Sequence, residues 1–315
     1  MKIVILDGHA LNPGDLSWNH FCEFGDVTYY DRTEGIDLTI HRMEGADIIL
    51  LNKTPITEEI LEASPNLKLI CVLATGYNVV DCDAAAKRNI PVCNVPGYGT
   101  NAVAQFTFAL LLEICNRVGL HSDTVHAGEW SSCPDFCYWK TPQMELCGKT
   151  LGIIGYGSIG RAVGKIAEAF GMNVLAYSRT HHAGTEYVDL DTLLQKSDVI
   201  TLHCPLFPET KCMINAQTIA KMKDGAILLN TARGPLLDEF AVAEALKNGK
   251  LRGAAMDVVS FEPIPADSPL LTAPNCIITP HMAWAPLEAR QRIMDITAGS
   301  IRAFLNGAKQ NVVNL

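Results

Sequence analysis

Arg233, Glu262 and His281 are side chains of complementary chemistry, and each stands shortly after a run of mostly apolar residues. If those runs are strands of one parallel sheet, their carboxyl ends meet at one edge, which is where open α/β sheets bind ligands. An Arg, a Glu and a His at such an edge suit the reduction of a 2-oxo acid.

In that chemistry each of the three side chains has its own role. Arg233 would clamp the substrate carboxylate and polarise the neighbouring carbonyl group. His281 would donate a proton to the carbonyl oxygen as a hydride reaches the carbonyl carbon. Glu262 would orient the imidazole and favour its charged form. Each also has a plainer interpretation, as a surface ion pair or a core residue, but the coincidence of all three favours catalysis.

A glycine-rich stretch, "LGIIGYGSIG", identifies the second reactant. Gly155, Gly157 and Gly160 have the G-x-G-x-x-G spacing, follow an apolar strand and open an amphipathic helix, which is the context that makes the motif informative. The first glycine permits a tight turn, the second lets a pyrophosphate approach the backbone, and the third lets helix and strand pack closely. The motif therefore predicts a dinucleotide bound at the start of that helix.

The next strand ends in "VLAYSRT", at the place where the ribose-binding acid of such a domain is expected. Ser178 occupies that place, and Arg179 and Thr180 follow. Without a carboxylate nothing repels a 2′-phosphate, and Arg179 could pair with it bidentately. These residues favour NADP(H) over NAD(H), although NAD(H) stays open because Arg179 could also stack on the adenine or face solvent.

The remaining elements must position these side chains. Five apolar runs before residue 96 predict one parallel sheet, and six runs after residue 149, alternating with helices, match the strand number of a doubly wound dinucleotide domain. Between the two series a helical pattern of roughly 25 residues without proline predicts one long helix. The final helical segment, 286–307, has the length and position to return to the first series.

The composition excludes several other classes of protein. The chain has 315 residues, of which 48% are apolar and 19% charged, with a net charge of −9 and no basic tract, so a nucleic-acid partner is not expected. No apolar stretch reaches the roughly 20 residues of a membrane span, and no signal peptide is evident. We therefore expect a cytoplasmic protein without a membrane partner. The eleven scattered cysteines predict free thiols and no metal site.

These motifs together resemble the D-isomer-specific 2-hydroxyacid dehydrogenases along essentially the whole chain. The matching stretches are "VLATGYNVVDCDAAAKRNIPVCNVPGYGTNAVAQFTFALLL", "GKTLGIIGYGSIG", "HCPLFPETKCMI", "NTARGPLLDE" and "ITPHMAW". Within the family the sequence is most similar to bacterial glycerate dehydrogenases, also called hydroxypyruvate reductases. The resemblance implies an α/β fold with two Rossmann-like or flavodoxin-like lobes, each on a parallel sheet, and an active site in the interdomain cleft.

The family also implies how the chain is divided and assembled. Residues 1–99 with 288–315 would form the substrate lobe, and residues 100–287 the dinucleotide-binding lobe. Members commonly dimerise through the nucleotide lobes, so a homodimer is expected. In similar hydroxypyruvate reductases an aromatic side chain from the partner's loop reaches the substrate, and Trp139 is a candidate for that role or for a plain dimer-core residue.

The family's catalytic and substrate-binding residues fall on matching positions of this sequence. Its catalytic Arg, Glu and His coincide with Arg233, Glu262 and His281. Lys53 stands where family members place a residue facing the substrate. Backbone amides at Thr75 and Gly76 would bind the substrate carboxylate. The family often has glycine where this chain has Ala74.

The family's cofactor contacts map onto eight further positions. Ser158 and Ile159 would lie at the pyrophosphate. The adenosine half would lie along Cys204, Pro205 and Thr210. The nicotinamide would lie near Thr231, Ala232 and Asp257, with Asp257 holding its carboxamide.

Three functions remain open at this point. The first is reduction of a small 2-oxo acid, hydroxypyruvate or glyoxylate, to a D-2-hydroxy acid. The second is reduction of pyruvate or bulkier 2-oxo acids, since Tyr77, Met282 and Trp284 could line a pocket of either size. The third is an NAD(H)-sensing scaffold or corepressor. Formate dehydrogenases of this fold have Gln at the position of Glu262, so Glu262 weakens the assignment of this chain as a formate dehydrogenase.

Overall fold

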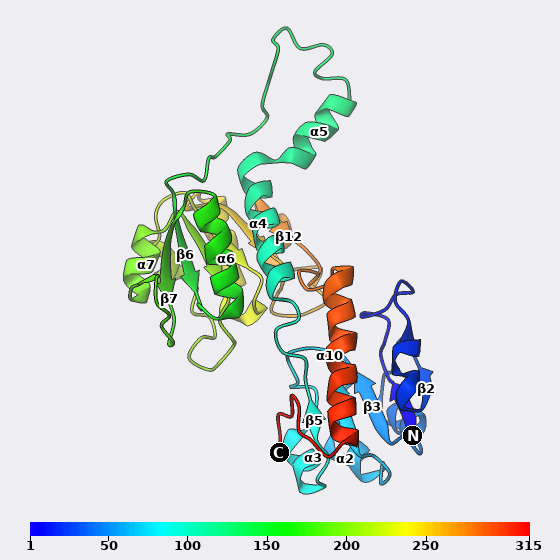
Figure 1. Ribbon diagram of the computed structural model, residues 1–315. Coiled ribbons are helices and arrows are strands. Elements are labelled where there is room, and N and C mark those ends of the chain that lie inside the picture. The colour runs from blue at the N-terminus through cyan, green and yellow to red at the C-terminus, as the bar shows by residue number, and fades with distance from the viewer. The chain divides into compact units, whose positions relative to one another are not determined.

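Two separate parallel sheets organise the protein, and each belongs to its own structural unit (Figure 1). A computed structural model describes residues 1–315. Unit 1 comprises Met1–Gly99 and Ala285–Leu315, and unit 2 comprises Thr100–Trp284. The chain therefore leaves unit 1 once and returns to it once.

The sheet of unit 1 has five parallel strands in the order β2-β1-β3-β4-β5. This is the flavodoxin-like order, in which the chain reverses direction across the sheet beside its first strand. The strands are short, nearly all their side chains except those of β2 are buried, and their bounds are Lys2–Ile5 (β1), Asp26–Tyr29 (β2), Ile48–Leu51 (β3), Leu69–Val72 (β4) and Val92–Cys93 (β5).

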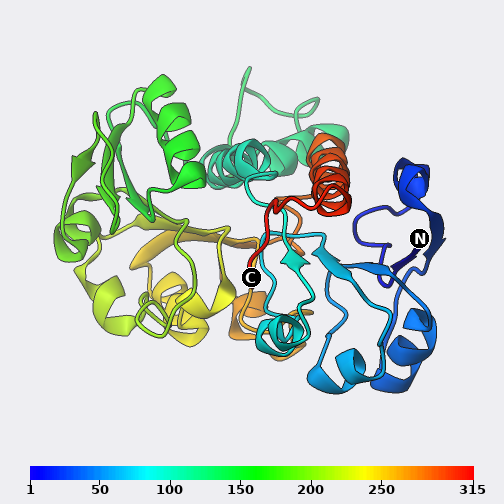
Figure 2. The same ribbon diagram turned by 60° about the horizontal axis from the view of Figure 1, so that its bottom comes forward.

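Helices cover both faces of this sheet, which is why its central strands are apolar throughout rather than alternating. One face packs against α1 (Ile36–Met43), α2 (Glu58–Glu62) and α3 (Cys82–Lys87). The other face is covered by the 3-10 helix η1 (Trp18–Phe24) and by α10 (Leu287–Leu305), as Figure 2 shows. The returning final helix was predicted from the sequence and is confirmed.

The last residues of the chain complete the edge of this sheet. The amide of Val313 donates to the Val92 carbonyl at 2.9 Å, and the Asn314 side chain accepts from the Val92 amide at 2.8 Å. At the other end of α10, Arg290 forms a two-pronged ion pair with Asp15 at 2.7 and 2.6 Å. Unit 1 is therefore built from both ends of the sequence.

The sheet of unit 2 has seven parallel strands in the order β12-β11-β10-β9-β6-β7-β8, the doubly wound dinucleotide-binding order with one strand added. All six predicted strands are confirmed. The seventh strand, β8, has two residues, lies at one edge of the sheet and was not predicted, because no apolar run marks it. The bounds are Thr150–Ile154 (β6), Asn173–Tyr177 (β7), Glu186–Tyr187 (β8), Val199–Leu202 (β9), Ala226–Asn230 (β10), Leu251–Met256 (β11) and Cys276–Ile278 (β12).

Two helical layers enclose the sheet of unit 2. On one face α4 (Thr100–Asn116) packs against α6 (Ser158–Ala169) and the sheet. The other face carries the remaining helices, α7 (Leu190–Lys196), α8 (Ala216–Lys221) and α9 (Glu239–Lys247), with the short 3-10 helices η2 (Gly234–Leu236) and η3 (Pro269–Thr272) nearby.

The single long helix predicted after residue 100 is wrong. The segment forms α4 and then α5 (Val118–His126), bent by 56° at Arg117, whose φ is 48°. The cause is packing: α4 is buried against the sheet, whereas α5 has no buried residue and leaves the body of unit 2 (Figure 1). The helical spacing of apolar residues continues across the break, so the pattern alone could not reveal it.

No single helix is both long and apolar enough to cross a membrane. The bent pair α4 and α5 meets that criterion only when its two members are taken together.

Candidate active site

The glycine turn joins β6 to α6 in the conformation that the motif predicted. Gly155 has a φ of +94°, and a Cβ there would lie 2.4 Å from the Cys204 amide nitrogen. A Cβ on Gly160 would lie 2.3 Å from the Gly155 carbonyl oxygen. A Cβ on Gly157, by contrast, would meet no atom within 4 Å. The first and third glycines are therefore required by packing, whereas the space beside the second is open to a ligand.

The first turn of α6 presents free backbone donors to that space. Gly157 is the N-cap of α6, and the first intrahelical bond runs from the Arg161 amide to the Gly157 carbonyl. The amides of Ser158 and Ile159 therefore have no partner within the helix. Donors at a helix N-terminus bind anions, because the amides point outward and the helix dipole adds partial positive charge.

The strand β9 ends directly against the glycine turn and adds no charge to it. The His203 amide donates to the Ile154 carbonyl at 2.7 Å. Burial lowers the pKa of the His203 imidazole to about 3 and raises the pKa of the Cys204 thiol to about 11. Both side chains are therefore neutral at pH 7. Cys204 follows β9 at the carboxyl edge of the sheet, where its backbone lies against Gly155, and Pro205 is the next residue.

Arg179 follows β7 and is held by an aromatic ring that the sequence did not single out. Its guanidinium carbon lies 4.8 Å from the centre of the Phe207 ring, and the side chain makes no hydrogen bond or ion pair with the protein. Thr210 fixes the turn that presents Phe207: its hydroxyl accepts from the Phe207 amide at 2.7 Å and donates to the Pro205 carbonyl at 2.9 Å. The N–H groups of Arg179 stay available to a ligand.

The three residues proposed for chemistry stand in loops that follow three adjacent strands. Arg233 follows β10, Glu262 follows β11 and His281 follows β12. The strands pair in parallel, so these loops share the carboxyl edge of the sheet. A Cβ on Gly234 would lie 1.9 Å from the carbonyl carbon of Val259, so the loop of Arg233 packs tightly against the start of the loop that carries Glu262.

Glu262 and His281 form the contact that the sequence suggested. Glu262 Oε2 lies 2.7 Å from His281 Nδ1, and both side chains are about one-third exposed. The contact fixes the ring and leaves Nε2 as the nitrogen that can meet a ligand. The Arg233 Nη1 donates to the Ala232 carbonyl at 2.7 Å, and its side chain is exposed.

Asp257 organises the loop of His281. Its carboxylate, in a residue only 1% exposed, accepts from the Thr279 hydroxyl at 2.6 Å and from the amides of Met282 and Ala283 at 2.9 and 2.8 Å. His281 itself has a φ of 52°, a strained value for a residue with a side chain, and its amide donates to the Asp257 carbonyl at 2.8 Å. The sequence assigned Asp257 only a contact with the cofactor and missed this supporting role.

A second missed residue holds the turn before Arg233. Asn230, fully buried at the end of β10, accepts from the Ala232 amide at 3.0 Å and donates to the Arg233 carbonyl at 2.9 Å. Thr231, predicted near the nicotinamide, is buried and its hydroxyl lies 3.1 Å from that of Thr107 on α4. An Asn that ends an apolar strand is a signal that could have identified this turn.

The predicted substrate residues of unit 1 lie at the carboxyl edge of its own sheet. Lys53 follows β3 and Thr75 and Gly76 follow β4, and these two strands pair in parallel. The Thr75 hydroxyl donates to the Val95 carbonyl at 2.8 Å and the Thr75 carbonyl accepts from Asn94. The backbone amides of Thr75 and Gly76 donate to no group of the protein, so they can bind an anion.

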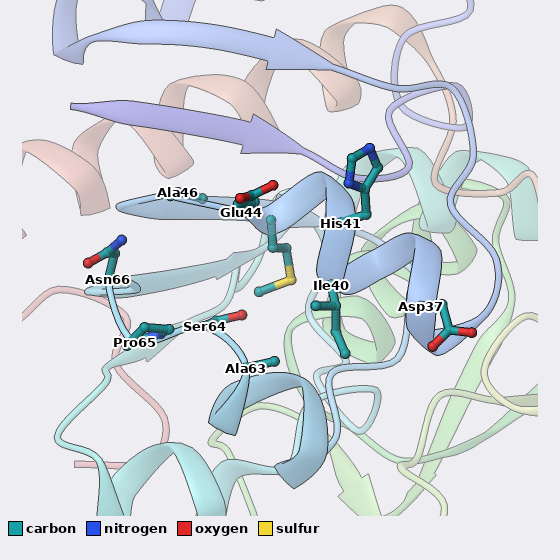
Figure 3. Close-up of a pocket in the computed structure, with 11 residues that line it drawn as sticks. Asp37, Ile40, His41, Glu44, Ala46, Ala63, Ser64, Pro65 and Asn66 are labelled. Atoms are coloured by element: carbon teal, nitrogen blue, oxygen red, sulfur yellow. The ribbon is translucent and has the colours of Figure 1, made fainter.

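Unit 1 has a cavity of about 550 Å³ that is not lined by Lys53, Thr75 or Gly76 (Figure 3). It is lined by α1, by Glu44 and Ala46 before β3, and by Ser64 and Asn66 before β4. These residues are at the amino ends of the strands whose carboxyl ends carry Lys53 and Thr75. The cavity therefore does not belong to the predicted substrate site.

Comparison with known proteins identifies the family. Residues 108–283 match the model of the "D-isomer specific 2-hydroxyacid dehydrogenase, NAD binding domain". Over the full length of both chains the sequence is 54% identical to a hydroxypyruvate reductase of Blautia hydrogenotrophica. It is 42% identical to a glycerate dehydrogenase of Methylorubrum extorquens, covering 99% of this chain and 98% of that one. The chain belongs to the D-isomer-specific 2-hydroxyacid dehydrogenases.

A solved structure supports the fold of the whole dehydrogenase. An acyclic imino acid reductase in complex with NADPH and D-Arg matches with a TM-score of 0.87 and 32% identity, covering 99% of this chain and all of the other. The family implies a nicotinamide cofactor, and unit 2 has the features to hold one. The open space at Gly157, the free amides of α6 and the unpaired guanidinium of Arg179 are each suited to part of a dinucleotide.

The glycine turn of this dehydrogenase gives a sharp test of nucleotide binding. We expect Gly157→Ala to leave the free energy of unfolding within about 0.5 kcal/mol of wild type, because the added Cβ meets no protein atom and φ is −78°. The same Cβ would obstruct the pyrophosphate and raise the Kd for NADH and NADPH by about tenfold or more. Calorimetry and nucleotide fluorescence titration measure the two quantities.

Gly160→Ala is the matched control, because its Cβ would collide with the Gly155 carbonyl oxygen. That variant should lose more than about 1 kcal/mol of stability. Wild-type nucleotide affinity in Gly157→Ala would show that the pyrophosphate does not approach this turn.

Proposed function

We propose that the protein reduces a small 2-oxo acid, hydroxypyruvate first and glyoxylate second, to the D-2-hydroxy acid with a nicotinamide nucleotide. The observation that carries the proposal is the 2.7 Å contact between Glu262, in the loop after β11, and His281, in the loop after β12. The exposed Arg233 lies in the loop after the neighbouring strand β10. The names of the two relatives supply the substrate class.

The chemistry assigns one task to each of these side chains. Arg233 binds the substrate carboxylate and draws electron density from the adjacent carbonyl. His281 Nε2 gives its proton to the carbonyl oxygen, while Glu262 at Nδ1 stabilises the charged ring that holds the proton beforehand. A bound reduced nicotinamide supplies the hydride that the carbonyl carbon receives. In the reverse direction His281 takes the hydroxyl proton.

Unit 1 contributes the remaining substrate contacts of the proposal. The unpartnered amides of Thr75 and Gly76 are donors for the substrate carboxylate. The exposed ammonium of Lys53, which has no ion-pair partner, is a second positive group at the same edge. A short 2-oxo acid with one carboxylate matches such donors. Bulkier 2-oxo acids are the alternative substrates, and steady-state kinetics with a panel of 2-oxo acids distinguishes them from the short ones.

The role of His281 is tested by His281→Asn. We choose Asn because it tolerates the φ of 52° at this position. The kcat for hydroxypyruvate should fall by about 10² to 10⁴-fold, the usual worth of a positioned proton donor, while the Kd for the nucleotide stays as in wild type. Steady-state kinetics with hydroxypyruvate, glyoxylate, pyruvate and phenylpyruvate give the comparison.

In that panel, wild type should have its highest kcat/KM with hydroxypyruvate. A preference for phenylpyruvate would replace the substrate assignment but keep the reaction. Near-normal turnover by His281→Asn would remove the histidine from the mechanism.

We infer that NADP(H) is the preferred nucleotide. The support is the guanidinium of Arg179, which rests on Phe207 with its N–H groups unengaged, and the lack of an acidic side chain at Ser178 and Thr180. A 2′-phosphate forms charge-assisted hydrogen bonds with a guanidinium in this state. NAD(H) remains the alternative.

Arg179→Ala tests this preference. We expect the KM for NADPH to rise by about tenfold or more, in line with the loss of a charge-assisted hydrogen bond, and the KM for NADH to change little. Lys211→Ala, which removes an exposed cation from the β9–α8 connection that carries Phe207, is the control. Equal changes for both nucleotides would assign Arg179 to the adenine instead.

We also propose a homodimer formed through α5 and the segment that follows it. This arm, residues 118–141, carries exposed apolar side chains, with Val118, Phe136 and Trp139 at 66%, 89% and 67% exposure. No residue of α5 is buried, and the arm extends away from the body of unit 2 (Figure 1). Large exposed apolar side chains gathered on one feature mark an interaction surface. Trp139 is the candidate that reaches the partner's substrate.

The mass in solution tests the assembly. Wild type should sediment at twice the 34.2 kDa of one chain, and Val118→Asp should shift it toward the monomer. Leu271→Asp, which places the same charge at an exposed leucine outside the arm, should not. A monomeric wild type at micromolar concentration would contradict the proposal.

A further inference from the structure

A carboxylate at the end of β1 collects three consecutive backbone donors from a neighbouring loop. Asp7 Oδ1 accepts from the Asn52 amide at 2.7 Å, and Oδ2 accepts from the amides of Lys53 and Thr54, the latter at 2.9 Å. The loop follows β3, which pairs directly with β1. Both groups therefore stand at the carboxyl edge of the sheet in unit 1.

The Asp7 carboxylate joins two segments that are far apart in the sequence. Burial raises the pKa of Asp7 above its usual value, while the three amides act in the opposite direction by stabilising the ionised form. Hydrogen bonds to a charged acceptor are stronger than those between neutral groups. The conformation of residues 52–54 thus depends on one side chain 45 residues earlier in the sequence.

Asp7 acts on the backbone of Lys53 and not on its ammonium. The carboxylate forms no ion pair with Lys53, and the Lys53 side chain is exposed without a charged partner. In the adjacent loop the amides of Thr75 and Gly76 are unused. An anion held by those amides would lie at the neighbouring strand end, next to the loop that Asp7 fixes.

We propose that Asp7 is the positioning residue that holds Lys53 where it meets the substrate carboxylate, and so sets the affinity of the enzyme for its substrate. The inference rests on the proposed function, in which Lys53 contacts the substrate. It assigns no direct substrate contact to Asp7 itself.

The test is a double-mutant cycle on the full-length protein. Asp7→Asn keeps the shape of the side chain but removes its charge and one acceptor oxygen, and Lys53→Met removes the ammonium. Each should raise the KM for hydroxypyruvate by about tenfold or more, with kcat less affected and the Kd for NADPH unchanged. The double variant should be no worse than Lys53→Met alone, because both changes remove the same interaction.

Asp47→Asn is the matched control. Asp47 also accepts a backbone hydrogen bond, from the Lys2 amide at 2.8 Å, but at the amino edge of the same strands. It should leave the KM for hydroxypyruvate unchanged. If Asp7→Asn fails to fold, Asp7→Glu keeps the charge, displaces the carboxylate by one methylene group and should raise the same KM by a smaller factor.

The outcomes distinguish the positioning role of Asp7 from the substrate contact of Lys53. If Lys53→Met raises KM and Asp7→Asn does not, the positioning role of Asp7 is wrong and the proposed function stands. If the two effects multiply in the double variant, Asp7 acts independently of Lys53, which also overturns the inference. If Lys53→Met has no effect, the substrate contact assigned to Lys53 is wrong and the role of Asp7 falls with it.

Discussion

A single buried carboxylate fixes the loop of unit 2 that carries His281. Asp257 collects three donors from residues 279–283, and these bonds hold His281 in a left-handed backbone conformation. Such a conformation costs on the order of 1–3 kcal/mol, and a hydrogen bond to a charged group contributes about 1.5–3 kcal/mol. The three bonds fix the loop on both sides of His281, and the imidazole is set opposite Glu262 before any ligand arrives.

Unit 1 uses the same device with a different side chain. Asp7 and Asp257 both follow a strand, and both accept backbone amides from the loop after a neighbouring strand. Loops at the carboxyl edge of a parallel sheet have no ladder hydrogen bonds to define them, so their amides need other acceptors. In each unit an aspartate supplies that acceptor and so specifies the shape of a loop proposed to carry function.

Much of the fold followed from the sequence because its signals are local. Continuous apolar runs predicted the central strands, and the glycine spacing predicted the turn at Gly155. The break at Arg117 was not predictable, because it depends on where α4 loses the surface that it packs against. The contacts of Phe207 with Arg179 and of Asp7 with residues 52–54 were also beyond reach. Each joins segments far apart in the chain, and no periodicity records such a pairing.

The order of the units along the chain has a consequence for synthesis on the ribosome. Unit 2 is continuous, so all of its native contacts can form once residue 284 has emerged. Unit 1 is the first to be synthesised, but it cannot complete its folding at that stage. One face of its sheet packs against α10, and Val92 at the sheet edge bonds to Val313 and Asn314, all of which are made later. Domains generally fold in the order in which they are made. Here the five strands of unit 1 are made first, but one face of their sheet keeps apolar surface uncovered until α10 has been made.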